Sequence, residues 1–476
     1  MEEEGEQIRR FLRLLESSGV GLIVDRYVKN ESPRGGRPSV NYHRLLATVL
    51  YGFSTGRATL RSIADSCAHD VRFIAMMQQC RPDYSTIAKF INKVIVPNEA
   101  EIFARVTKAA AAEMGARLDD AFVDGSKFEA NANKYKFVWK PTTFHERVSS
   151  SFHALCRGSG LLKGYSEERI CGPGRKSYFK TDRDATAMCL KSDYYSGLGT
   201  NMHAAYNVQL VVCRGIVAAY AVTQSRADVN DFAAAIEAFF AIHGRYPANV
   251  CADAGYGSPG NYSFLKARGI GNFVKDQSWE GNASGSRPDC YRMRGGAPVC
   301  LAGRPCRERE VAGRHPKKPG GRFYSVTGCR GCPFHDYCFR FVRNGSGADE
   351  KVFEINLDCL ALKAEAEANL LSPKGIELRV NRSIQVEGAF GILKHDYGYE
   401  RMRRRGIARV STEVMLNALG LTVAKLFRFY ETGKTPDFWE APPEMAPQAF
   451  KKPSAKRLSK KGRKIHEKAF AEKEHA

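Results

Sequence analysis

The stretch that decides the fold reads Arg382-Ser-Ile-Gln-Val-Glu387-Gly-Ala-Phe-Gly-Ile-Leu-Lys394. Apolar residues recur along it at spacings of four, three and four, and they are Val386, Phe390, Leu393 and Tyr397. This spacing predicts an amphipathic helix that buries these side chains. Glu387 and Lys394 lie seven residues apart, nearly two helical turns, and so share one face. A solvated helix face is a sufficient explanation for such a pair, unless carboxylates elsewhere in the chain join it.

Two upstream segments each end in an aspartate close to glycine. They read Ala121-Phe-Val-Asp124-Gly and Val250-Cys-Ala-Asp253-Ala-Gly-Tyr-Gly257, and each predicts a short buried strand with the aspartate at its end. For one such aspartate, a turn-forming role is the better explanation. Together with Glu387, the two aspartates favour a shared site, at which small neighbouring residues would let a DNA backbone approach.

Carboxylates in this combination are suited to Mg²⁺ or Mn²⁺. Metal-assisted hydrolysis of a phosphodiester needs oxygen ligands that hold two ions about 4 Å apart. One ion activates the attacking water or hydroxyl, and the other stabilises the leaving oxygen. We therefore expect Asp124, Asp253 and Glu387 to be catalytic and to bind the metal, and Lys394 to contact a phosphate.

The charge balance indicates a polyanionic partner, for which double-stranded DNA is the candidate. The 476 residues carry 73 Lys and Arg against 51 Asp and Glu, a formal net charge of +22, and a merely basic surface is the alternative. Apolar residues make up 43% of the chain, which excludes global disorder. The acidic start Met1-Glu-Glu-Glu does not resemble a signal peptide, and we expect no apolar segment of the ~20 residues that span a bilayer. A cytoplasmic protein without membrane contact is predicted.

The order of periodic segments predicts an α/β fold class and five parts. These are an N-terminal all-helical, DNA-binding domain at 1–116, a core at 117–278 and 351–430, a Cys-rich insertion at 279–350 and a basic tail at 431–476. In the core we expect a mixed sheet flanked by helices. The expected strands are 121–123, 205–212, 216–222 and 249–252, and the expected helices are 230–243 and 260–268. A helical dimerisation domain is the alternative for the N-terminal part, in which Asp83 or Ser85 would cap a helix.

The insertion contains clustered cysteines. It reads Cys329-Arg-Gly-Cys332-Pro-Phe-His-Asp-Tyr-Cys338, with Cys306 upstream. Thiolates at this spacing can close a structural Zn²⁺ site, for which His335 is a further candidate ligand. Free thiols in a basic insertion are the alternative, since a disulfide framework is not expected in a cytoplasmic protein.

Several separated motifs, in this order, resemble bacterial insertion-sequence transposases of the DDE type. They are Asp124-Gly-Ser-Lys-Phe-Glu-Ala-Asn-Ala-Asn133, Val222-Thr-Gln-Ser-Arg-Ala-Asp228-Val-Asn-Asp231, Asp253-Ala-Gly-Tyr-Gly257 and Gln385-Val-Glu387-Gly-Ala-Phe-Gly391. The likeness covers most of residues 15–430. It implies an RNase H-like core with Asp124, Asp253 and Glu387 as the metal-binding triad, and an insertion of the Cys-containing kind that some members carry.

The resemblance also implies an activity. It is that of a DNA transposase, which cuts the ends of the element and joins them to target DNA by two-metal-ion hydrolysis and transesterification, as a homodimer on DNA near the bacterial nucleoid. Lys394 falls where the family's Glu-x6-Lys signature places its lysine, and Arg382 and Lys127 are further candidate substrate contacts. The signature's arginine and tyrosine positions hold Ser383 and Val380 here, with Arg382 one place away. A nuclease with the same core and a non-catalytic DNA-binding protein derived from a transposase are the alternatives.

Overall fold

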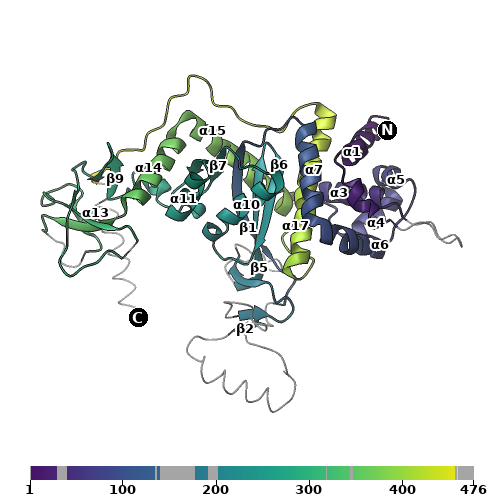
Figure 1. Cartoon of the computed structure of the whole chain (residues 1–476), viewed down its shortest axis with the longest axis horizontal. Coiled ribbons are helices and arrows are strands. Elements are labelled where there is room, and N and C mark those ends of the chain that lie inside the picture. Colours follow the sequence, from purple (N-terminus) through teal and green to yellow (C-terminus); the bar gives the residue numbers. More distant parts are fainter. Residues whose placement is uncertain are drawn as a thin grey trace, which may run out of the picture. The chain divides into compact units, whose positions relative to one another are not determined.

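The computed structural model describes residues 2–28, 40–133, 137–139, 177–190, 202–317, 319–342, 347–455 and 458 (Figure 1). The chain forms two compact units, which are described separately below. Unit 1 comprises Met1–Pro247 and Arg382–Phe438, and unit 2 comprises Ala248–Asn381 and Trp439–Ala476. Nearly all of the basic tail after residue 455 lies outside the described residues.

Unit 1 begins with helices, as the sequence predicts. They are α1 (Glu2–Ser17), α2 (Gly21–Asp25), α3 (Tyr42–Ser54), α4 (Leu60–His69), α5 (Val71–Met77), α6 (Tyr84–Phe90) and α7 (Glu99–Glu113). The predicted cap at Asp83 is confirmed, because its Oδ1 accepts a hydrogen bond from the backbone N–H of Thr86 at 2.7 Å. The division of the chain into five parts stays a prediction.

The strands of unit 1 are antiparallel. They are β1 (Asp120–Glu129), β4 (Thr186–Cys189), β5 (Met202–Cys213) and β6 (Ile216–Thr223), and β5 pairs with each of the other three. A short pair, β2 (Phe137–Trp139) and β3 (Ser177–Phe179), stands apart. The expectation that Asp124 ends its strand is wrong. Pairing with β5 continues from Phe122 to Glu129, so Asp124 lies inside β1.

One long helix, α17 (Ile407–Thr432), joins the strands of unit 1 to its N-terminal helices (Figure 1). The backbone N–H of Val217 in β6 donates to Thr422 Oγ1 at 3.1 Å. At Gly420 a Cβ atom would lie 2.7 Å from the carbonyl carbon of Phe53, so glycine permits the close approach of α17 to α3. On β6, helix α10 (Phe232–His243) also packs, with His243 Nε2 3.0 Å from the carbonyl oxygen of Ala218.

The same helix corrects one expectation. By length and composition α17 could cross a membrane, whereas no apolar segment long enough to span a bilayer was expected from the sequence. Its most apolar window is 83% buried within the fold, which is the behaviour of a core helix. No other helix among the described residues is long and apolar enough to do so.

The stretch that carries Glu387 is helical throughout. It consists of a π-helical turn η6 (Ser383–Glu387), α16 (Gly388–Gly391) and a second π-helical turn η7 (Ile392–Asp396), and it directly follows α15 (Pro373–Arg382). Val386, Phe390 and Leu393 are buried, which confirms the predicted core positions. Tyr397 is half-buried, and its hydroxyl donates to the carbonyl oxygen of Ser54 at 2.6 Å.

Unit 2 contains a parallel strand pair. Strand β7 (Asn249–Ala252) is followed by α11 (Pro259–Ala267) and then by β8 (Gly271–Val274), which pairs with β7 in parallel register. Helices α12 (Trp279–Ser284) and α14 (Leu357–Leu371) belong to the same unit. With antiparallel strands in unit 1 and this pair in unit 2, the chain is α/β and compatible with an RNase H-like core.

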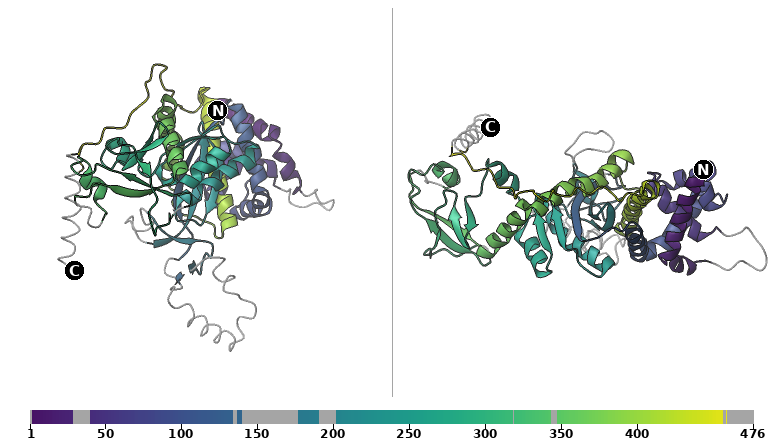
Figure 2. Two further views of the ribbon diagram at one scale, coloured as in Figure 1. Left: turned by 60° about the vertical axis from the view of Figure 1, so that its left-hand side comes forward. Right: turned by 90° about the horizontal axis from the view of Figure 1, so that it is seen from above.

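The insertion forms small antiparallel sheets at the N-terminal end of α14 (Figure 2). They consist of β9 (Tyr291–Arg294) with β10 (Ala297–Cys300), and of β11 (Arg307–Glu308), β12 (Arg322–Val326) and β13 (Lys351–Ile355), next to the short helix α13 (His335–Phe339). The expectation of helix from residue 351 is wrong for its first residues, because β13 pairs with β12 from Lys351 to Ile355.

Candidate active site

Asp124 and the helix that carries Glu387 lie on the same face of the sheet in unit 1. Side chains alternate along a strand, so Asp124 and Phe128 point to one face of β1. The ring of Phe128 packs against Phe390, with ring centroids 6.2 Å apart. Because Phe390 is three residues after Glu387, this contact sets η6 and α16 against the face to which Asp124 points.

A single guanidinium connects the two carboxylates. Arg382 Nη1 lies 4.0 Å from Asp124 Oδ2, and Arg382 Nη2 donates to Glu387 Oε1. Ser383 Oγ donates to the other carboxylate oxygen of Glu387, Oε2, at 2.8 Å. The Arg382 side chain is only 11% exposed, against 21% for Asp124 and 45% for Glu387. The structure therefore brings two of the three predicted carboxylates to one cation.

The two predicted lysines differ in where they lie. Lys394 Nζ donates to the carbonyl oxygen of Lys127 at 3.1 Å and lies 4.6 Å from the ring centroid of Phe128, a cation–π contact. It therefore lies beside β1 on the face of Asp124. Lys127 is three residues after Asp124 in the same strand, so its side chain points to the opposite face.

Asp253 belongs to unit 2 and follows β7 directly, as predicted. Its Oδ1 accepts a hydrogen bond from the backbone N–H of Gly255 at 2.8 Å, which is the turn-forming contact weighed in the sequence analysis. At Gly257 a Cβ atom would lie 2.4 Å from the carbonyl oxygen of Lys275, so glycine is needed there by the chain's own packing. A metal-binding role for Asp253 stays a prediction.

A buried polar network, not predicted from the sequence, lies behind Asp124. Asn207 Nδ2 and Gln209 Nε2 donate to Asp228 Oδ1 at 2.7 and 3.1 Å, and Asn207 Nδ2 also donates to Asp231 Oδ2 at 3.1 Å. At Gly125 a Cβ atom would lie 2.3 Å from Gln209 Nε2 and 2.8 Å from Asp228 Oδ1. The space beside Gly125, on the face of β1 opposite to Asp124, is thus filled by this network. Whether small neighbouring residues let DNA approach Asp124 stays a prediction.

Burial sets the ionisation of this network. Desolvation raises the pKa of Asp231, and the nearby Asp228 adds to the increase, while hydrogen bonds from Thr223 and Asn207 oppose it. A signal for these residues was present in the sequence, since Asp228 and Asp231 lie in one of the motifs that carry the family resemblance. The family resemblance did not give Asp228 or Asp231 a role. Their positions hold the loop after β6 against β5.

The carboxylate pair offers the donors that a hard divalent cation takes. Mg²⁺ and Mn²⁺ prefer carboxylate oxygens, and Asp124 and Glu387 supply these around one cationic group. Across the described ranges, no three His, Cys, Asp or Glu side chains are close enough to hold a metal ion. Two predicted ligands are together in unit 1, and the third is in unit 2.

The cysteines of the insertion pack as part of a small core. A cavity of about 30 Å³ is lined by Cys290, Cys300, Cys329, Cys332 and Cys338, among others. Cys306 and Cys329 are buried in a cluster with Tyr324, Val326, Phe339 and Ile355. Burial raises the pKa of Cys306 to about 11 and also raises the pKa of Cys329, and neighbouring thiols add to both increases. No group of three or more Cys, His, Asp or Glu side chains among the described residues is placed to hold a metal ion, and the zinc site at Cys306, Cys329, Cys332 and Cys338 stays a prediction.

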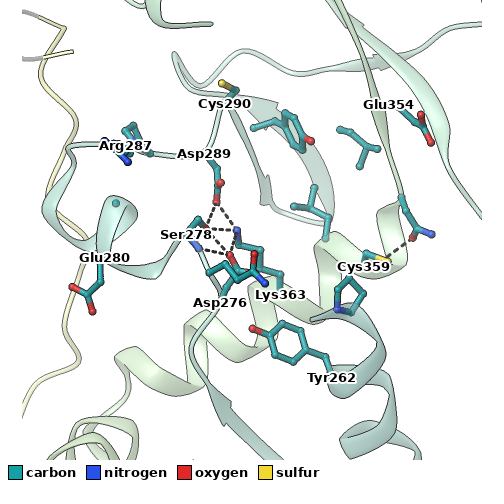
Figure 3. A pocket seen from close by; sticks show the side chains of 18 of the residues that line it. Tyr262, Asp276, Ser278, Glu280, Arg287, Asp289, Cys290, Glu354, Cys359 and Lys363 are labelled. Atoms are coloured by element: carbon teal, nitrogen blue, oxygen red, sulfur yellow. Dashed lines mark hydrogen bonds and ion pairs between the residues drawn. The ribbon is translucent and has the colours of Figure 1, made fainter. Parts of the chain in front are cut away.

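Unit 2 also contains a larger cavity, of about 1140 Å³ (Figure 3). At its wall Lys363 Nζ donates to Ser278 Oγ at 2.6 Å and Asp289 Oδ2 at 2.7 Å, and lies 2.8 Å from Asp276 Oδ1. Burial alone would lower the pKa of Lys363, but the two carboxylates outweigh it and raise that pKa. The cluster ties α14 to the loop after β8 and to the segment before β9, which is a structural role.

Two family models match the chain. One, described as a transposase DDE domain, matches residues 299–427 and so includes Glu387 and Lys394. The other, described as a transposase domain (DUF772), matches residues 2–93, which contain the N-terminal helices. No curated protein and no solved structure matches the chain. The matches support a transposase role, and transposases with a DDE domain are enzymes that cut and transfer DNA strands and typically use divalent metal ions. More particularly, the two matches support the assignment of this chain to the DDE transposases of insertion sequences.

Proposed function

We propose that this protein cuts the ends of an insertion element and joins them to target DNA at one metal-dependent site. The observation that carries the proposal is the convergence of Asp124 and Glu387 on a single cation, on the face of β1 along which Lys394 also lies. Carboxylates held around a positive charge are the donor set that phosphoryl transfer requires. The family assignment supports the reaction class, and the net charge of +22 supports DNA as the substrate.

The proposed reaction has two steps at the same centre. Water first attacks the phosphorus at the element's end, the phosphorus–oxygen bond to the 3′ oxygen breaks, and a 3′-hydroxyl is released. That hydroxyl then attacks a phosphorus of target DNA in line, and the displaced strand leaves as a second 3′-hydroxyl. Bound Mg²⁺ or Mn²⁺ supplies Lewis-acid stabilisation of the nucleophile and of the leaving oxygen.

The protein's own side chains have separate roles in this scheme. Asp124, Glu387 and Asp253 would hold the ions. Lys394, held against β1 by its contact with Lys127 and Phe128, neutralises charge on the phosphate. A zinc ion at the cysteines of the insertion would have a structural role, and no step of this scheme uses it.

The remaining assignments concern partners and location. The helices within 1–116 and the basic tail recognise the terminal repeats, two copies of the chain assemble on the paired ends, and the protein works in the bacterial cytoplasm at the nucleoid. The tail supports contact with phosphates, since residues 450–476 contain ten Lys and Arg but only three Glu. Lys127 contacts DNA on the other face of β1.

An assay of cleavage and strand transfer tests the proposal. Duplex DNA with the element's inverted repeats is incubated with target DNA in Mg²⁺ or Mn²⁺, comparing the wild type, Asp253→Ala and Asp336→Ala. Asp336 is a matched control, because it lies in unit 2 with a side chain that is 88% exposed. Joined products from the wild type and the control, and none from Asp253→Ala, are expected. Cleavage without joining would favour the nuclease, and binding without metal-dependent products the non-catalytic protein.

A further inference from the structure

Arg382 lies where a positive charge is needed to hold two carboxylates together. One terminal nitrogen of its guanidinium faces Asp124 Oδ2 at 4.0 Å, and the other donates to Glu387 Oε1. The arginine is more buried than either partner, with 11% of its side chain exposed. Burying an arginine this far is unfavourable unless its charge is compensated, and here the two carboxylates compensate it.

Both oxygens of Glu387 are occupied in this arrangement. Oε1 accepts from Arg382 and Oε2 accepts from Ser383 Oγ at 2.8 Å. A divalent ion binds the same oxygens, so Glu387 cannot ligate an ion through Oε1 and keep its hydrogen bond to Arg382. Two cations within a few ångströms of each other also repel, and the low exposure of Arg382 weakens the screening of this repulsion by water. The arginine and the metal therefore compete for one position.

We propose that Arg382 is an internal counter-ion that holds Asp124 and Glu387 together before metal binds and is displaced when metal enters. This inference rests on the proposed function and concerns regulation of the same site. Without a cation, the two carboxylates would repel each other, and the π-helical turn that carries Glu387 would lose its charged link to β1, with only the contacts of Phe390 and Lys394 remaining. Arg382 is thus a positioning residue in the metal-free protein.

Displacement gives the arginine a second use. A guanidinium released from the carboxylates remains beside the metal centre, and its planar donors suit a phosphate. Arrival of metal and DNA together would transfer Arg382 from the carboxylates to the phosphate. Metal binding would then be weak without DNA and stronger with it, because DNA offers the displaced arginine a new partner.

Titration of Mn²⁺ into DNA-free protein, followed by electron paramagnetic resonance of the unbound ion, tests the competition. Arg382→Met removes the competing charge and is expected to bind Mn²⁺ about fivefold or more tightly than the wild type, the equivalent of one partly buried ion pair. Arg382→Lys keeps a charge that cannot contact both carboxylates at once, so its affinity should fall between the two. Arg409→Met is the matched control, since Arg409 is exposed in the first turn of α17, and its loss should change the affinity by less than about twofold.

The outcomes separate this inference from the proposed reaction. Equal or weaker Mn²⁺ binding by Arg382→Met, in a variant whose thermal unfolding matches the wild type, would overturn the counter-ion role. If Arg382→Met unfolds early, the comparison of Arg382→Lys with the wild type decides instead, and tighter binding by the lysine variant is required. Strand transfer by the wild type is measured separately, so its absence would refute the proposed reaction and leave the competition result standing.

Discussion

Lys363 offers the sharpest test of how buried charge stabilises unit 2. Its ammonium group contacts Ser278, Asp289 and Asp276 at 2.6 to 2.8 Å, and its side chain is 18% exposed. Lys363→Met removes the cation and leaves two carboxylates, 19% and 28% exposed, without their main partner. Breaking a buried ion pair in this way costs about 3–5 kcal/mol, and partial exposure of the carboxylates places the expected loss near about 3 kcal/mol.

The dependence of this loss on pH gives a second, independent readout. Burial opposes ionisation of Asp276, but hydrogen bonds from Lys363 and Ser278 hold its pKa below the usual value, so its stabilisation is present above that value and lost as the pH falls through the lowered pKa. The pKa of Lys363 is raised, so its own contribution disappears only in strongly alkaline solution. The wild type should therefore keep this contribution at neutral pH. In Lys363→Met the carboxylates accept protons more readily, and the destabilisation should shrink towards pH 4.

Differential scanning calorimetry at pH 7 and pH 4 measures both effects. A loss of about 3 kcal/mol corresponds to a fall in the melting temperature of roughly 6–12 °C for a unit of this size. Lys266→Met is the control, because Lys266 pairs with Glu365 at 3.0 Å with 64% of its side chain exposed, and its loss should cost less than about 1 kcal/mol. Equal destabilisation by the two variants, or the same loss at both pH values, would refute the reasoning.

Three further predictions follow from packing and ionisation. Gly420→Ala places a methyl group between α17 and α3 and should destabilise unit 1 by about 1–3 kcal/mol, as measured by denaturant unfolding. An unchanged unfolding midpoint would contradict the close approach of α17 to α3. A hydrogen bond from Cys338, with the positive charges of Lys351 and Arg340, holds the pKa of Cys290 well below that of an ordinary thiol. Cys290 should therefore be alkylated before Cys306 in a brief reaction at pH 7, which mass spectrometry measures. Burial raises the pKa of Asp231, so the wild type loses stability as the pH rises above the usual aspartate range, and Asp231→Asn should flatten that slope in urea unfolding between pH 4 and 7.

The sequence predicted the helix of Glu387 well, because its core positions follow helical spacing over several turns. Val386, Phe390 and Leu393 are all buried. It did not predict where Arg382 points. Two π-helical turns interrupt the regular helix, and the partner of Arg382 on β1 is far away in sequence. Contacts of this kind depend on tertiary packing, which residue spacing along one element does not encode.

The strands also include some that the sequence predicted and some that it did not. Residues 249–252 were predicted with the observed bounds, because glycine-rich turn residues follow the aspartate that ends β7. Strand β1 continues well past the predicted Val123, since Gly125 and Lys127 lower its apolar content without preventing pairing to β5. Pairing with β12 likewise makes residues 351–355 a strand that the sequence suggested as the start of a helix. Strand ends are set by the partner strand as much as by local composition.

Strand transfer by Glu387→Gln tests the central claim most directly. The substitution preserves the shape and removes the charge on the helix that faces β1, and Glu400→Gln, at an exposed position beyond η7, is its control. With inverted-repeat DNA, target DNA and Mn²⁺, joined products should form with the wild type and Glu400→Gln, and should fall by at least about a hundredfold with Glu387→Gln. Undiminished joining by Glu387→Gln would contradict the assignment of this carboxylate to the metal site.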